Sequence, residues 1–98
     1  MNPQPAVIEE IAERFSRFLN VERLILYGSR ARGDEEERSD IDLAVAGPIT
    51  EKEWRKMRDY VELEARTLLS VELVRLEQAS ERLRANIQRE GVTLYERH

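Results

Sequence analysis

The chain of 98 residues contains no cysteine, and this absence excludes disulfide bonds and thiolate metal sites. It also lacks any run of the roughly 20 apolar residues that a membrane-spanning helix needs. The first residues, MNPQPAVIEE, have neither the basic start nor the apolar centre of a signal peptide. The sequence therefore predicts a cytoplasmic protein with no membrane segment.

An excess of positive charge is absent as well. With 16 basic and 20 acidic side chains the net charge is −4, whereas a broad nucleic-acid surface normally needs a clustered basic excess. Histidine occurs once, as His98, and we expect no ligand role for a terminal residue. The length predicts one domain over residues 1–98 with a single core.

The stretch over residues 24–45, LILYGSRARGDEEERSDIDLAV, carries the chemistry that this sequence predicts. It begins as an apolar strand, followed by a turn at Gly28-Ser29 and by a charged run over residues 34–38 that predicts a solvated loop. A glycine at the end of a strand lets the backbone approach a ligand closely, and Ser29 is expected to cap a short helix whose free amides attract anions. The turn is a candidate phosphate cradle.

Two aspartates open a second predicted strand after the loop. Residues two apart share a face of a strand, so Asp40 and Asp42 should project together. The apolar residues Ile41, Leu43 and Val45 should then face the core. Neighbouring carboxylates repel each other unless a cation lies between them, and magnesium usually reaches a protein through one or two carboxylates plus substrate phosphates. The pair is a candidate metal site.

Three longer helices are predicted around this stretch. Apolar residues at helical spacing indicate a first helix to about Leu19. A capping box at Thr50, answered by a glutamate three residues later, begins a second helix to about Leu69. Trp54 fits the apolar stripe of that helix and is interpreted as core rather than as a base-stacking platform. Residues 80–91 are typical of a third helix, with a serine at its start and a glycine as its stop.

A third strand is predicted over residues 71–76, VELVRL. Glu72 shares a strand face with apolar neighbours, and an isolated acid in such surroundings needs a partner. A metal ion held by Asp40 and Asp42 would be such a partner, whereas Arg75 lies on the opposite face. The elements together predict an α+β fold, a small mixed β-sheet flanked by helices, on which an apolar tail over residues 92–95 packs back.

The spacing of these residues resembles a known signature. Gly28-Ser29, ten intervening residues and Asp40-Ile41-Asp42 look like the signature of the polymerase-beta-like nucleotidyltransferases. YGSRARG followed by SDIDLAV is most similar to the minimal nucleotidyltransferases, small prokaryotic proteins often encoded beside a HEPN-domain protein, and the C-terminal EGVTLYE extends the likeness. The resemblance implies the polymerase-beta-like fold as a single minimal domain, without the acceptor-binding domain of larger relatives.

The resemblance also implies a metal-dependent reaction. Asp40 and Asp42 would hold two Mg²⁺ ions, and Glu72 would bind the ion that activates the nucleophile and accept its proton. The third carboxylate of the family is typically an aspartate, so Glu72 is a departure, and its extra methylene puts full activity in question.

The nucleotide-binding residues that the resemblance implies all lie in the first half of the stretch. Gly28 and Ser29 would hold the outer phosphates of ATP, and Arg30 and Arg32 would neutralise charge on the triphosphate. These two arginines are also explained as solubilising residues beside an acidic loop.

The function implied by the resemblance is transfer of AMP from ATP to a tyrosine of a HEPN-domain ribonuclease toxin, which this chain would silence as its antitoxin. One alternative is a binding module that neutralises its partner by contact alone, with a residual nucleotide site. Another is nucleotidyl transfer to a small molecule such as an aminoglycoside, as larger relatives do. The sequence leaves open the acceptor, the preferred nucleotide and whether the chain forms a homo-oligomer.

Overall fold

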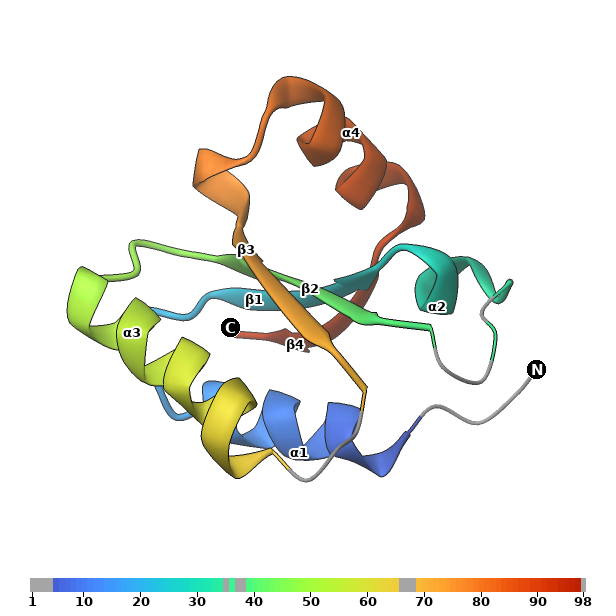
Figure 1. The fold of residues 1–98 in the computed structure, drawn as a ribbon. Helices are drawn as coiled ribbons and strands as arrows, with labels where there is room; N and C mark the ends of the chain where they lie inside the picture. The colour runs from blue at the N-terminus through green and yellow to red at the C-terminus, as the bar shows by residue number, and fades with distance from the viewer. Residues whose placement is uncertain (1–4, 35, 37–38, 66–68, 98) are drawn as a thin grey trace.

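A four-stranded β-sheet with helices on both faces organises the computed structural model, which describes residues 5–34, 36, 39–65 and 69–97 (Figure 1). The strands are β1 (Arg23–Tyr27), β2 (Ile41–Ala46), β3 (Val71–Arg75) and β4 (Val92–Glu96). Their order across the sheet is β3-β2-β1-β4; β1 runs antiparallel to β2 and β4, whereas β2 and β3 are parallel. The predicted α+β fold with a small mixed sheet is confirmed.

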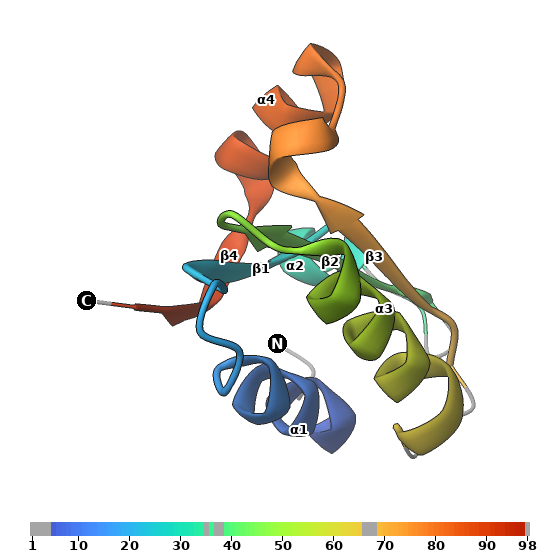
Figure 2. The ribbon, with the colours of Figure 1, turned by 90° about the vertical axis from the view of Figure 1, so that its left-hand side faces the viewer.

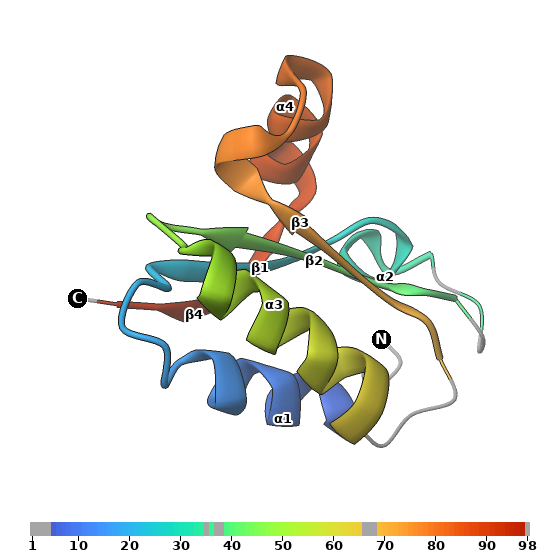
Figure 3. The same cartoon turned by 60° about the vertical axis from the view of Figure 1, so that its left-hand side comes forward.

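The helices lie in two layers. They are α1 (Ala6–Phe15), α2 (Ser29–Arg32), α3 (Glu51–Asp59), the π-helical turn η1 (Tyr60–Glu64), the 3-10 turn η2 (Leu76–Gln78) and α4 (Glu81–Glu90). Figure 2 shows α1 and α3 on one side of the sheet and α4 on the other. In Figure 3, α3 and η1 lie in the connection between β2 and β3, which as a parallel pair require a crossover.

In the part of the chain that the structure describes, no helix combines the length and apolar character that crossing a membrane would require.

Alternating side chains along β2 build a core on each face of the sheet. Ile41, Leu43 and Val45 are fully buried in the larger core, which α1 supplies with Ile11 and Phe15. The smaller core lies on the α4 side; its buried residues are Ile25, Ala44, Ala46, Leu76 and Ile87. The predicted inward set of β2 is confirmed, and the even-numbered residues of β2 consequently face α4.

Helix caps follow the sequence signals in two of three places. Thr50 Oγ1 accepts a hydrogen bond from the Glu53 amide at 3.1 Å while Glu53 Oε1 accepts one from the Thr50 amide at 3.0 Å, so the capping box is confirmed. Ser80 caps α4 in a similar way. The predicted cap at Ser29 is wrong: Gly28 is the cap residue, because it makes the turn itself with φ 77° and ψ −156°, and the chain is helical from Ser29 onward.

The first helix is shorter than predicted. It ends at Phe15 rather than near Leu19. The Ser16 hydroxyl donates a hydrogen bond to the Glu13 carbonyl at 2.7 Å and so competes with the helical backbone pattern. The following residues form turns, and Leu19 is 78% exposed.

The second predicted helix and the third strand also end early. The helix was predicted to about Leu69, but Ala65 leaves the helical conformation with ψ 126°. The Ala65 amide bonds to the Tyr60 carbonyl, which closes η1 as a wider, π-helical turn. The strand ends at Arg75, and the next residue begins η2.

The apolar tail predicted to pack on the sheet is a full strand, β4. Leu24 pairs with Tyr95 and Leu26 with Val92, with a shift of register between Leu24 and Ile25. β4 is therefore an edge strand that gives β1 its second neighbour.

Some predictions fall on residues 35, 37–38, 66–68 and 98, which lie outside the described residues. They concern part of the charged loop, the last turn expected of the second helix, and His98.

Replacement of Thr50 by alanine should lower the free energy of unfolding by about 1 kcal/mol, because the amide of Glu53 loses its acceptor at the start of α3. Urea denaturation measures this difference. Thr50→Ser retains a hydroxyl and is the control; equal losses in both variants would show that the hydrogen bond is not the cause.

Candidate active site

Three neighbouring strands place Tyr27, Asp42 and Glu72 in one row across the sheet. Tyr27 on β1 pairs with Asp42 on β2, and Asp42 pairs with Glu72 on β3. Directly paired residues project on the same face with their Cβ atoms about 5 Å apart. The structure thus brings together the two acids that the sequence placed on separate strands. Glu72 is solvent-exposed, because β3 is the edge of the sheet.

The Gly28 turn lies directly against this row. A Cβ atom built at Gly28 would lie 2.5 Å from Asp42 Oδ2, which is closer than real Cβ contacts come. The backbone of Gly28 also has a positive φ that residues with side chains rarely adopt. Both properties require glycine, and they place the start of α2, with Ser29, beside the carboxylate.

Burial and neighbouring negative charge change the protonation of Asp42. Partial burial, the hydrogen bond and negative charge of Glu72, and the charge of Asp40 together raise the pKa of Asp42 from 3.8 to about 6. The positive charge of Arg32 opposes this shift. The two paired carboxylates thus lie close enough to share a proton when no cation separates them.

The donor set suits a hard divalent cation. Within the described residues, no ion pair includes Asp40, Asp42 or Glu72, and no three acids form a group that could hold a metal ion. Two paired carboxylates remain, and Mg²⁺ is commonly bound by one or two carboxylates plus water and substrate phosphates. Asp40 is exposed and precedes β2, so the structure leaves it next to the pair rather than in it.

Arg30, predicted to neutralise the triphosphate, lies largely inside the protein. The residue is 6% exposed, and its Nε and Nη2 donate hydrogen bonds to the Ser39 carbonyl at 3.0 and 2.9 Å. These bonds connect α2 to the residue before Asp40. The structure therefore gives Arg30 a part in fixing the start of β2, and phosphate binding by Arg30 stays a prediction.

Arg32 lies at the exposed end of α2. Its Nε is 3.2 Å from Asp34 Oδ2, and its Nη1 is 3.0 Å from Glu90 Oε2 on α4. Since its charge acts on Asp42, the guanidinium lies within electrostatic reach of the acidic pair. The charge of Arg32 therefore reaches the candidate site.

Tyr27 is a residue of the site that the sequence reasoning treated only as part of a strand. Burial, followed by the negative charges of Asp42 and Glu72, raises the pKa of Tyr27 to about 12. The phenol therefore stays protonated at neutral pH and can donate a hydrogen bond. The sequence did contain a signal for this residue. The last strand residue before a Gly-Ser turn lies close to any ligand that the turn binds.

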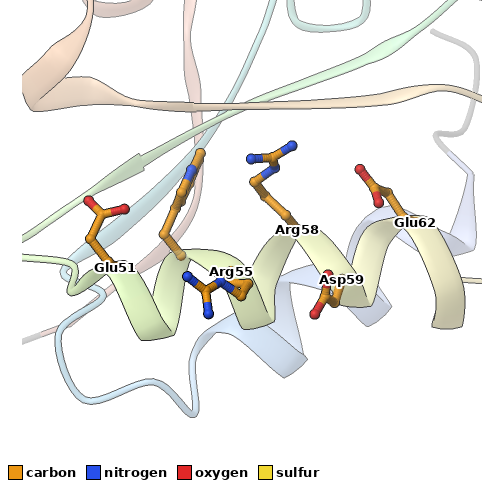
Figure 4. A pocket seen from close by; sticks show the side chains of 6 residues that line it. Glu51, Arg55, Arg58, Asp59 and Glu62 are labelled. Carbon is orange, nitrogen blue, oxygen red and sulfur yellow. The ribbon is translucent and has the colours of Figure 1, made fainter.

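A hollow lies away from this row, on α3 and η1. Figure 4 shows its labelled charged residues along α3 and η1; the lining is Glu51, Trp54, Arg55, Arg58, Asp59 and Glu62. Trp54 is half-buried against the larger core, as interpreted from the sequence, and the Arg75 guanidinium lies over its ring at 5.2 Å from the centroid. Because the larger core lies on the sheet face opposite Asp42, this hollow is separate from the acidic row.

Comparison with known families decides the classification. Residues 9–98 match the family described as Polymerase beta, Nucleotidyltransferase. The chain belongs to this nucleotidyltransferase family. A search of curated proteins finds no match.

Solved structures of this nucleotidyltransferase fold include chains of toxin–antitoxin complexes. One, a complex with AMP-PNP, matches with a TM-score of 0.68 and 22% identity over 92% of this chain and 74% of that chain. A mutant MntA–HpeT complex gives 0.71 and 23% over 99% and 76%. The tri-AMPylated Shewanella oneidensis HEPN toxin in complex with MNT antitoxin gives 0.60 and 20% over 94% and 72%. Identities this low show a shared fold.

Replacement of Gly28 by alanine should abolish Mg²⁺-dependent binding of ATP, since the new methyl group would displace Asp42 and strain the turn. Isothermal titration calorimetry measures the binding. Gly33→Ala is the matched control: Gly33 also has a positive φ, but nothing lies within 4 Å of its added Cβ. Equal damage from both variants would assign the effect to backbone strain alone.

The raised pKa of Asp42 predicts how stability depends on pH. Folding favours the protonated carboxyl, so in a chelator the wild type should lose stability as the pH rises from about 4 to about 6. Asp42→Asn cannot ionise and should therefore have the higher melting temperature at neutral pH, with the difference vanishing below about pH 4. Thermal melts across this range test the sign, with Asp59→Asn on the exposed surface of α3 as control. The raised pKa of Asp42 would be contradicted if the melting temperature of the wild type increased relative to that of Asp42→Asn as the pH rises.

Proposed function

We propose that this chain transfers AMP from ATP, with Mg²⁺, to a tyrosine of a HEPN-domain toxin and acts as the antitoxin of that partner. The observation that carries the proposal is the pairing of Asp42 with Glu72 across β2 and β3, with the Gly28 turn packed against Asp42. Membership of the nucleotidyltransferase family supports the reaction class. Structural neighbours with AMP-PNP and with an AMPylated HEPN toxin support the nucleotide and the acceptor.

Each part of the site has a role in this reaction. Asp42 and Glu72 would hold one Mg²⁺ ion, and Asp40 would join Asp42 at a second. Bound metal supplies charge stabilisation for the transferring phosphoryl group and its leaving oxygen. The turn at Gly28 and Ser29 would receive the outer phosphates through its backbone amides.

The bonds, the leaving group and the proton of the proposed transfer can all be accounted for. The tyrosine oxygen forms a bond to the α-phosphorus of ATP, and the bond from this phosphorus to the bridging oxygen of pyrophosphate breaks. Pyrophosphate leaves with the electron pair. The phenolic proton goes to the carboxylate of Glu72, which is exposed and can pass it on to water.

The acceptor has to come from another molecule in this proposal. Tyr27 is the tyrosine nearest the acidic pair in register, but it is half-buried within the sheet and its pKa is raised to about 12. Both properties make it a poor nucleophile. An exposed tyrosine of a bound partner fits the open edge of the sheet at Glu72.

Incubation of the chain with a HEPN-domain partner, ATP and Mg²⁺ should add AMP to the partner, which intact-mass spectrometry detects. Asp42→Asn should reduce the transfer by at least about a hundredfold, because the metal-binding pair loses one charge. Asp59→Asn, on the α3 surface, is the matched control and should transfer normally.

A second candidate function, neutralisation by contact alone, is favoured by one observation: the acids of the described residues form no group of three. In that case the partner would keep its mass, and Asp42→Asn would still suppress it as a complex. Unchanged mass together with a stable, inhibited complex would replace enzymatic transfer by this function.

A further inference from the structure

Two carboxylates from different parts of the chain hold Arg32. Asp34 accepts from Nε at 3.2 Å, and Glu90, the last residue of α4, accepts from Nη1 at 3.0 Å. The side chain of Glu90 is 24% exposed, whereas that of Asp34 is 62% exposed. Glu90 is thus the better shielded partner. Among the described residues, the Nη2 group of Arg32 has no hydrogen-bond partner, so one nitrogen of the guanidinium is left to donate elsewhere.

Glu90 lies at this position because the chain changes abruptly from helix to strand after it. α4 ends at Glu90, and β4 begins after a single residue, Gly91. A Cβ atom at Gly91 would meet the Ile87 carbonyl oxygen and would lie 2.5 Å from Ile25 Cγ2 on β1. Gly91 thus allows the last turn of α4 to lie directly on the sheet. This packing gives a physical reason for the opening Glu-Gly of EGVTLYE.

Arg32 itself belongs to the candidate site. It ends the short helix that begins after Gly28, the glycine whose turn packs against Asp42. A free arginine side chain loses conformational entropy when a ligand fixes it. Contacts that fix the side chain beforehand remove part of this cost from binding.

We propose that Glu90 is a positioning residue for the nucleotide: its ion pair with Arg32 holds the guanidinium beside the acidic row, with Nη2 left to donate to a phosphate oxygen of a nucleoside triphosphate. The inference rests on the proposed function and extends it to a residue of the C-terminal helix. Arg89 also approaches Glu90, at 3.7 Å, but it is 68% exposed and too distant for a hydrogen bond. Arg32 is therefore the partner through which Glu90 acts.

The test measures the dissociation constant of Mg²⁺-ATP by isothermal titration calorimetry without a partner protein, so that binding is separated from transfer. Glu90→Ala should weaken binding about two- to fivefold, the range expected when a partly exposed ion pair is lost. Glu90→Gln keeps an acceptor for Nη1 and should stay within about twofold of the wild type. Gln88→Ala, at an exposed position of α4, is the control and should bind like the wild type.

A double-mutant cycle shows whether Glu90 acts through Arg32. Arg32→Ala should weaken binding at least about tenfold, since a charge-assisted hydrogen bond to phosphate is lost. Adding Glu90→Ala to Arg32→Ala should then change nothing further. Equal or tighter binding by Glu90→Ala, or the same loss with and without Arg32, would overturn the inference.

The outcomes separate this inference from the proposed function. If the variants bind Mg²⁺-ATP as the double-mutant cycle predicts but no AMP is transferred to a HEPN partner, the proposed function is refuted and the role of Glu90 is retained. If AMP is transferred to the partner while Glu90→Ala binds ATP like the wild type, the proposed function is retained and the role of Glu90 is refuted. A wild type that does not bind Mg²⁺-ATP would refute both.

Discussion

The closeness of two negative charges on adjacent strands is the constraint on which the rest of this structure depends. Asp42 and Glu72 repel each other, yet the parallel register of β2 and β3 holds them side by side. Parallel neighbours need a crossover, and α3 with the segment after it provides one. The apolar core under β2 supplies the stability that keeps the strands in register. The larger core therefore stabilises the site from the opposite face of the sheet.

Burial separates the two arginines of the Gly28 turn into different roles. Arg30 is buried and binds a backbone carbonyl, so its charge serves the geometry of the loop that leads to β2. Arg32 is exposed enough to meet a ligand and is held by side chains instead. In the sequence the two arginines look alike. Their different burial in the fold shows that Arg30 makes a structural contact and that Arg32 makes an electrostatic one.

Much of the fold could be predicted because local patterns determine it. The alternation of Ile41, Leu43 and Val45 gave the inner face of β2, and the capping box gave the start of α3. Helix ends were missed where competing hydrogen bonds, such as that of Ser16, outweigh a continuing apolar pattern. β4 was missed as a strand because its pairing with β1 is set by packing between distant segments.

The candidate site was predictable in its residue types but not in its geometry. The pairing of Asp42 with Glu72 depends on the register of two strands, which the sequence does not state directly. The contact of Arg32 with Glu90 joins residues 58 positions apart in the sequence, and no local signal marks it. Asp40 directly precedes β2 and is exposed, and its charge still acts on Asp42.

The position of β4 after the other strands along the chain has a consequence for biosynthesis. During translation β1 and the turn at its end leave the ribosome long before β4, so the edge of β1 that β4 will cover is at first unpaired. The sheet around the candidate site is therefore complete only after α4 and β4 have been synthesised.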